Sequence, residues 1–275
     1  MRLIKTLEHK DERQIWRILI SGSDKLILET RDVATKEVFY HCIDLSDFKG
    51  VFYNLQFEEK CRLGIETIYK EILFFHKFPK PDLPGHKEII AFDLASQKIL
   101  WSNNDLSFLF AADGKVYGFR QGFEERYFTA LDYMTGEVIE DLGTDYRRVN
   151  SLRSQSEDEK DLTPYLFPRI YSTGGTSSDA GKIIDAHIEG LNPAGNIEFA
   201  VCNDLLFFNY HITGSGGLLT NKFAAYDLVR GELLIDEILN FRARTLFTDS
   251  FFVYKEFLFL LREKNEVIIY RIEYN

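Results

Sequence analysis

One short pattern occurs at least three times in this chain, and it constrains the fold more than any other feature. An apolar strand ends in an Asp, a tight turn follows, and a second strand begins. The clearest copies lie at residues 128–139, 223–234 and 90–100, the last with Gln97 where the others have glycine. A pattern that returns in tandem indicates one supersecondary unit used several times.

The spacing of the copies predicts the number of units. Five residues occupy the Asp position, with separations of 49, 39, 95 and 44: Asp44, Asp93, Asp132, Asp227 and Arg271. Asp32 also follows a strand, but it lies 61 residues before Asp93, too far for one unit. In the copy at Asp44 we assign the turn to Lys49–Gly50. The interval of 95 is about two units, so a degenerate copy is expected within it, and the total is six.

Each unit has the same internal order. An apolar strand precedes a tight polar turn, a more apolar second strand, a variable loop, the Asp-ending strand, a short turn and a fourth strand. The second strands, such as 72–75, 205–208 and 257–261, are continuous apolar runs, as expected for strands buried on both faces. Four-stranded units of about 40–50 residues in tandem are typical of β-propeller blades. We predict an all-β fold in which residues 1–275 form one β-propeller domain of six four-stranded antiparallel blades.

The two ends of the chain complement each other. The last unit stops at its third strand, 267–274, and an unassigned apolar segment at 2–7 precedes the first unit. We predict that this N-terminal strand closes the last blade as its outer strand. Such pairing would join the ends of the ring and cover an exposed sheet edge.

The fourth blade is expected to be irregular. Residues 150–162 are polar and without periodicity, which predicts a mobile insertion. The segments 165–167, 169–171 and 183–188 are interpreted as strands of this blade.

The best copy of the repeat, residues 130–137, is an Ala-x-Asp followed by x-x-Thr-Gly and another strand. It resembles the repeat of the pyrroloquinoline-quinone (PQQ) type β-propellers, and Trp101 matches the Trp that ends the family repeat. The resemblance covers nearly the whole chain and implies a propeller fold, as in small bacterial propeller proteins. The family's enzymes imply a quinone with Ca²⁺, an adjacent Cys pair and many Trp. Here no two Cys are adjacent and there are two Trp, so no cofactor is expected.

The charge and composition of the chain limit the classes of partner that it is expected to bind. The net charge of −10 and the absence of a basic patch argue against nucleic-acid binding. The N-terminus lacks a signal-peptide pattern and no apolar run is long enough to span a membrane. Three widely spaced cysteines fit a reducing compartment. A cytoplasmic monomer without membrane contact is expected.

No catalytic or metal-binding motif stands out. Asp185, His187 and Glu189 alternate on a predicted strand and would share one face, but the polar side of a half-buried strand explains them better than a metal. Two Gly-rich segments, 173–182 and 213–217, enter strands rather than helices, so we interpret them as hairpin tips. The repeated Asp residues are expected to be structural and to accept from N–H groups of the turn. We predict no catalytic residue and no metal.

A binding face is predicted from loop length. The loops between second and third strands are long and varied, and we call them the long-loop face: 79–87, 121–126, 172–182 and 211–222. Loops held by a rigid scaffold often carry function. Five side chains at the strand–loop junctions are candidate ligand-binding residues: His86, Arg120, Tyr171, Tyr210 and His211.

Two classes of function are compatible with these observations. The favoured one is a non-catalytic binding or scaffolding propeller, whose partner is an unknown protein or small molecule on the long-loop face. The alternative is a divergent propeller enzyme, hydrolase or quinoprotein-like, with its site at the central channel. Convergent carboxylates in that channel would favour the enzyme.

Overall fold

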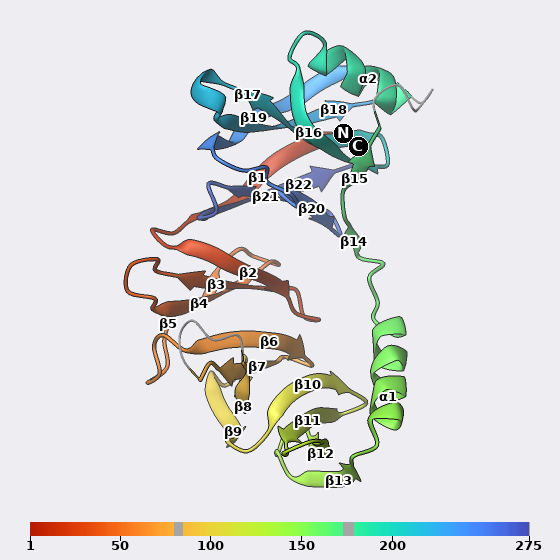
Figure 1. Cartoon of the computed structure of the whole chain (residues 1–275). Coiled ribbons are helices and arrows are strands. Elements are labelled where there is room, and N and C mark those ends of the chain that lie inside the picture. Colours follow the sequence, from red (N-terminus) through yellow and green to blue (C-terminus); the bar gives the residue numbers. More distant parts are fainter. Residues whose placement is uncertain (80–84, 173–178, 275) are drawn as a thin grey trace. The chain divides into compact units, whose positions relative to one another are not determined.

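The computed structural model describes residues 1–79, 85–172 and 179–274. In this part of the chain, antiparallel strands form five sheets of four or five strands, and two α-helices accompany them (Figure 1). The all-β prediction is confirmed, whereas five sheets stand where six blades were predicted. The chain divides into two compact units. We call Glu12–Lys160 the three-sheet unit, and Met1–Asp11 with Asp161–Asn275 the two-sheet unit.

The three-sheet unit contains three sheets that follow one another in sequence, and each has its strands in chain order. The first sheet consists of β2 (Gln14–Ile20), β3 (Lys25–Arg31), β4 (Val38–Asp44) and β5 (Gly50–Leu55). The second consists of β6 (Leu63–Tyr69), β7 (Ile72–Lys77), β8 (Lys87–Asp93) and β9 (Lys98–Asn103). The third consists of β10 (Ser107–Ala112), β11 (Lys115–Gln121), β12 (Arg126–Asp132) and β13 (Val138–Gly143).

The two-sheet unit has five strands in each sheet. One sheet consists of β15 (Arg169–Tyr171), β16 (Pro193–Cys202), β17 (Leu205–Thr213), β18 (Leu219–Asp227) and β19 (Glu232–Ala243), with the short helix η1 (Ser215–Gly217) between β17 and β18. The other consists of β14 (Tyr165–Leu166), β20 (Phe251–Tyr254), β21 (Phe257–Arg262), β22 (Glu266–Glu273) and β1 (Arg2–Lys10).

The hydrophobic core lies between the sheets because the second and third strands present apolar side chains on both faces. In the three-sheet unit, Leu73 and Phe75 of β7 pack with Ile27 and Tyr40 of the first sheet. The opposite face of β7 packs through Phe74 with residues of the third sheet. Continuous apolar runs are therefore required in these strands, as their sequences indicated.

The repeated Asp residues end the third strand of each four-stranded sheet and strand β18 of the β15–β19 sheet, and they cap the turn that follows. Oδ1 of Asp132 accepts from the backbone N–H groups of Met134 and Thr135, both at 2.9 Å. Oδ1 of Asp227 accepts from the backbone N–H groups of Val229 and Arg230, at 2.9 and 3.0 Å. The predicted structural role of these carboxylates is confirmed.

The fourth residue after each Asp has a left-handed backbone. Gly136 and Gly231 have φ of 73° and 67°, and Gln97 adopts 56° in the same place. In the copy after Asp44 this position is Phe48, with φ of 59°, so our assignment of the turn to Lys49–Gly50 was wrong by two residues. The Asp-anchored turn thus imposes this conformation even on side chains that disfavour it.

The predicted pairing of the N-terminal strand is confirmed. Strand β1 runs antiparallel to β22, from Arg2 opposite Glu273 to Lys10 opposite Glu266. A bulge at Thr6 interrupts the ladder, and the Thr6 hydroxyl donates to the carbonyl of Ile269 at 3.1 Å. The N-terminal strand therefore covers the edge that β22 would otherwise expose.

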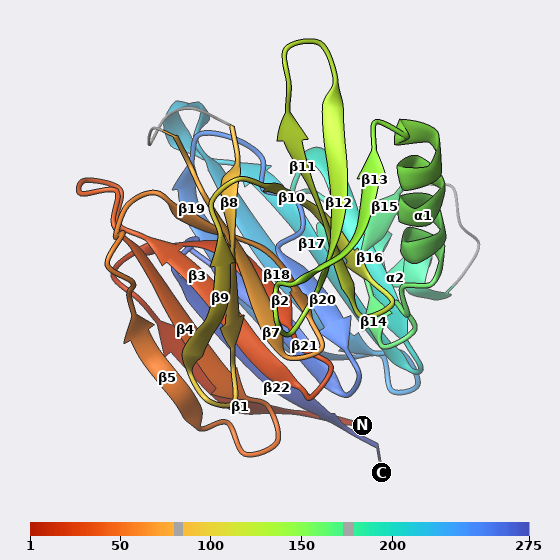
Figure 2. The same cartoon turned by 90° about the horizontal axis from the view of Figure 1, so that it is seen from below.

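The expected fourth blade is not a sheet of its own. Strand β14 pairs with β20 and β15 with β16, so the segments predicted to share one blade extend two different sheets. Residues expected to form the mobile insertion instead form helix α1 (Tyr146–Asp158), which lies beside the third sheet (Figures 1 and 2). Asp145 caps its first turn by accepting from the backbone of Arg148, and Val149 packs on that sheet.

The segment 183–188 is also helical rather than extended. It belongs to α2 (Asp179–Ile188), which packs on the β15–β19 sheet through Ala180, Ile184 and Ile188. Consequently Asp185 and His187 do not share a face, since residues two apart diverge on a helix. His187 instead bonds the hydroxyls of Tyr226 and Tyr210, both at 2.8 Å.

Candidate functional site

The first strand of each sheet in the three-sheet unit carries a β-bulge. In β2 the register shifts between Ile15 and Arg17, which leaves Trp16 outside the ladder. The corresponding shifts in β6 and β10 leave Glu66 and Leu109 outside it. Bulges re-aim side chains and are enriched beside functional sites. Three bulges in three consecutive first strands therefore single out one edge of each sheet.

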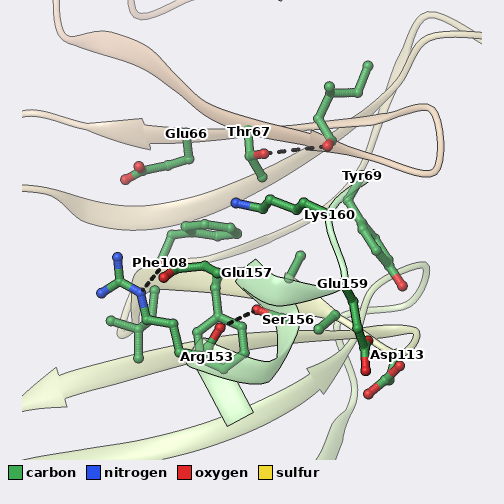
Figure 3. A pocket seen from close by; sticks show the side chains of 15 residues that line it. Glu66, Thr67, Tyr69, Phe108, Asp113, Arg153, Ser156, Glu157, Glu159 and Lys160 are labelled. Carbon is green, nitrogen blue, oxygen red and sulfur yellow. Dashed lines mark hydrogen bonds and ion pairs between the residues drawn. The ribbon is translucent and has the colours of Figure 1, made fainter. Parts of the chain in front are cut away.

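Two of these bulges contribute to a pocket of about 460 Å³ within the three-sheet unit (Figure 3). Its walls come from β6, from β10 and from the last two turns of α1 with the residues that follow. The lining side chains labelled in Figure 3 are Glu66, Thr67, Tyr69, Phe108, Asp113, Arg153, Ser156, Glu157, Glu159 and Lys160. The volume suits a small organic molecule.

The pocket has more acidic than basic groups. Of its six charged side chains, four are carboxylates and two are cations. Arg153 is paired with Glu157 at 3.0 Å. In the view of Figure 3, Asp113 and Glu159 both lie at the lower right end of the pocket. Within the described ranges neither of these two carboxylates forms an ion pair, so this end of the pocket is negatively charged.

The remaining polar groups are held by the backbone. The Ser156 hydroxyl donates to the carbonyl of Arg153 at 2.8 Å. The Tyr69 hydroxyl accepts from the backbone of Gly114 at 2.8 Å. Phe108 supplies the aromatic wall and is itself fixed by stacking on Phe74, with ring centroids 5.8 Å apart.

Glu66 connects the pocket wall to a pair of histidines. Its Oε1 lies 2.7 Å from Nδ1 of His86 and 3.0 Å from Nδ1 of His76. The two imidazole rings are stacked, with centroids 3.6 Å apart and planes 5° from parallel. Burial by itself would raise the pKa of the Glu66 carboxyl, but the contacts with His76 and His86 outweigh it and lower the pKa below its usual value.

The predicted ligand-binding residues are divided between the two units. His86 and Arg120 belong to the three-sheet unit, whereas Tyr171, Tyr210 and His211 belong to the two-sheet unit. His86 contacts Glu66 as described. Arg120 is exposed and its guanidinium lies 5.5 Å from the ring centroid of Tyr127.

The other three are buried. Tyr171 is 5% exposed and Tyr210 is fully buried, and both belong to the core between α2 and its sheet. His211 is also buried, and its Nε2 accepts from the backbone of Phe247 at 3.0 Å. Parts of the long-loop face, 80–84 and 173–178, lie outside the described residues. So does the larger part of the Gly-rich segment at 173–182, but its described end, 179–182, begins helix α2, so the prediction that this segment enters a strand was wrong.

No pattern in the sequence pointed to Glu66, His76 or the pocket residues of α1. Glu66 and His76 stand on two different strands, and neither lies in the repeated motif.

Among the helices of the described part of the chain, none is both long and apolar enough to cross a membrane.

The comparisons with known proteins match the chain in part. A model of a domain of unknown function (DUF4905) matches residues 20–101, which lie in the three-sheet unit. No curated protein sequence matches.

Several solved structures are distantly similar in fold. A member of the DUF4221 family from Bacteroides vulgatus is 10% identical with a TM-score of 0.36, and the alignment covers 99% of this chain and 98% of that one. A europium-containing methanol dehydrogenase is 13% identical with a TM-score of 0.32, covering 95% of this chain and 52% of that one. The Dos1 propeller is 10% identical with a TM-score of 0.31, covering 95% and 69%. Likeness at this level does not imply a shared function.

Proposed function

We propose that the protein is a non-catalytic binding protein, and that the pocket between β6, β10 and α1 takes a small organic cation with an apolar body. The observation that carries this proposal is the pair of bulges at Glu66 and Leu109, which turn both residues out of the ladder and into the pocket wall. A rigid sheet with a locally broken ladder is a suitable frame for a preformed site.

The chemistry of the lining supports a cation. A bound ammonium group would pair with Asp113 or Glu159, carboxylates of the lining that form no ion pair with another described residue. The apolar body of the ligand would pack on Phe108, whose ring is held in place by Phe74. Aromatic rings that are already fixed cost little entropy when a ligand packs on them.

A binding role is favoured over hydrolysis because the hydroxyl that could act as a nucleophile is not next to a base. Ser156 donates to the carbonyl of its own helix rather than to a histidine or carboxylate. A nucleophile of this type needs an adjacent general base.

We further propose that the five sheets are the blades of a β-propeller. Each sheet is an antiparallel array of four or five strands, and the strand preceding the Asp turn is the last but one in each sheet that has such a turn. Trp101 supports this arrangement within the three-sheet unit, because its Nε1 donates across to the carbonyl of Tyr133 in the next sheet at 3.0 Å. The helices α1 and α2 then lie in the part of the chain where the fourth of six blades was predicted.

The ligand proposal is tested by isothermal titration with three probes that share a phenyl ring. These are 2-phenylethylamine, the uncharged 2-phenylethanol and the anionic 3-phenylpropionate. We expect 2-phenylethylamine to bind at least about tenfold more tightly than the other two, equivalent to about 1.4 kcal/mol. Preferential binding of 3-phenylpropionate would contradict a cation site and point to Lys160 instead.

Matched variants locate the site. The double change Asp113→Asn with Glu159→Gln should abolish the preference for the amine, because both changes remove charge and keep shape. Glu124→Gln is the control, since Glu124 is an exposed carboxylate in the turn between β11 and β12 and does not line the pocket. Equal amine binding by the double variant and the control would place the site elsewhere.

A further inference from the structure

Two imidazoles and one carboxylate meet beside the pocket. One ligand atom from each of Glu66, His76 and His86 lies within 4.8 Å of the other two. Imidazole nitrogens and carboxylate oxygens are the donors preferred by Zn²⁺ and neighbouring divalent transition metals. We propose that these three side chains bind one such ion.

His76 gives an independent reason to expect a ligand here. Its side chain is 1% exposed, and among the described residues neither ring nitrogen makes a well-aligned hydrogen bond. Buried polar groups are nearly always partnered, so a buried imidazole whose contact with Glu66 is poorly aligned points to a further group that completes it. An ion bound through Nδ1 would supply that partner.

The backbone around His76 is built to admit the ring. A Cβ atom on Gly64 would lie 2.9 Å from both Cε1 and Nε2 of His76. Real Cβ atoms do not approach that closely, so a side chain at Gly64 would displace the imidazole. The position of the His76 ring therefore depends on Gly64 of strand β6, which also carries Glu66.

The geometry requires one movement. The two rings are parallel and 3.6 Å apart, whereas metal–nitrogen bonds are about 2.0–2.1 Å long and lie near the ring plane. One ion cannot lie in both ring planes, so His86 must rotate out of the stack to coordinate it. The side chain of His86 is 37% exposed and can turn, while its backbone carbonyl is anchored by the Ser107 hydroxyl at 2.7 Å.

The surrounding charges permit a cation. The nearby guanidinium of Arg31 is paired at 2.6 Å with Glu29, which is fully buried. Arg17 is turned to the main chain, where it donates to the carbonyl of Glu66 at 3.4 Å. A divalent ion held by one carboxylate and two neutral imidazoles keeps a positive charge and at least one position open to water.

The test is a titration of the full chain with Co²⁺ and Zn²⁺, followed by calorimetry and by the visible absorption of Co²⁺. We expect one equivalent to bind with a dissociation constant of about 10 μM or tighter, while Mg²⁺, which prefers oxygen ligands, does not compete. His86→Ala should weaken Co²⁺ binding at least about tenfold and change the spectrum, since it removes a nitrogen donor.

Two further variants complete the design. His76→Gln should weaken Co²⁺ binding as His86→Ala does. Glu88→Gln is the matched control because Glu88 is a neighbouring carboxylate on β8 that pairs with Lys77 instead, and its Co²⁺ binding should equal that of the unaltered chain. The proposal is overturned if Co²⁺ and Zn²⁺ do not bind at about 100 μM, or if binding survives both histidine changes.

The metal proposal and the pocket proposal can fail separately. His86 and His76 do not line the pocket. His86→Ala should therefore leave binding of 2-phenylethylamine unchanged while it weakens that of Co²⁺.

Discussion

At the scale of single residues, two separate reasons favour glycine in the Asp turn: its positive φ and, at Gly136, the close approach of Trp101. Gly136 has φ of 73°, and a Cβ there would lie 2.6 Å from the Trp101 ring. Gly231 has φ of 67° but meets nothing within 4 Å. Gly231→Ala should therefore cost about 1 kcal/mol for the backbone alone, and Gly136→Ala about 2–3 kcal/mol because Trp101 must also move. Thermal or urea unfolding measures the difference. Equal losses would show that Trp101 does not contact this turn.

The same turn makes a prediction about pH. Backbone hydrogen bonds from Thr135 and Met134 lower the pKa of Asp132 in the folded protein, although partial burial opposes them. A lowered folded pKa means that the stabilisation is present above the ordinary Asp value of about 3.9 and is lost as the pH falls through the folded pKa. An NMR titration of the Asp132 carboxyl carbon should give a midpoint below that of a peptide model. A midpoint at or above the model value would contradict the turn geometry.

At the scale of elements, strand β1 should contribute much of the stability of the two-sheet unit. It pairs along β22, and Met1 and Leu3 pack against the core cluster of that unit. A chain that begins at Arg13 loses these contacts and exposes the β22 edge. We expect a loss of about 3 kcal/mol, which lowers the melting temperature by roughly 6–12 °C. An unchanged melting temperature would show that the N-terminal strand is dispensable.

The strands with Asp turns could be predicted from the sequence, whereas the two helices could not. The third strands and their Asp turns could be predicted because the motif is local and its hydrogen bonds join residues two or three apart. The helix α1 was missed because it buries little more than Val149 and has no strong apolar stripe. Its stabilising contacts include polar pairs four residues apart, such as Arg153 with Glu157. Helix α2 was predicted as a strand because residues 183 and 184 are two adjacent apolar residues, as in a buried strand.

At the scale of the whole molecule, the sequence predicted a binding face from loop length, while the structure draws attention to bulges in first strands. Long loops are visible in a sequence, and His86 was selected as a candidate for that reason. A bulge depends on the register between two strands, and Glu66 meets His76 and His86 only through that register. Tyr210 was selected as a junction residue, but its hydroxyl is bonded to His187 within the core. Tertiary contact, rather than local pattern, decides which of these side chains can reach a ligand.

The most direct test of the central claim is to map the binding of 2-phenylethylamine by amide NMR on the full chain. If the ligand binds in the proposed pocket, we expect chemical-shift changes centred on three segments that line it, at 66–69, 108–113 and 153–160. Changes confined instead to 121–126 and 211–222 would place the ligand on the long-loop face and contradict the pocket between β6, β10 and α1.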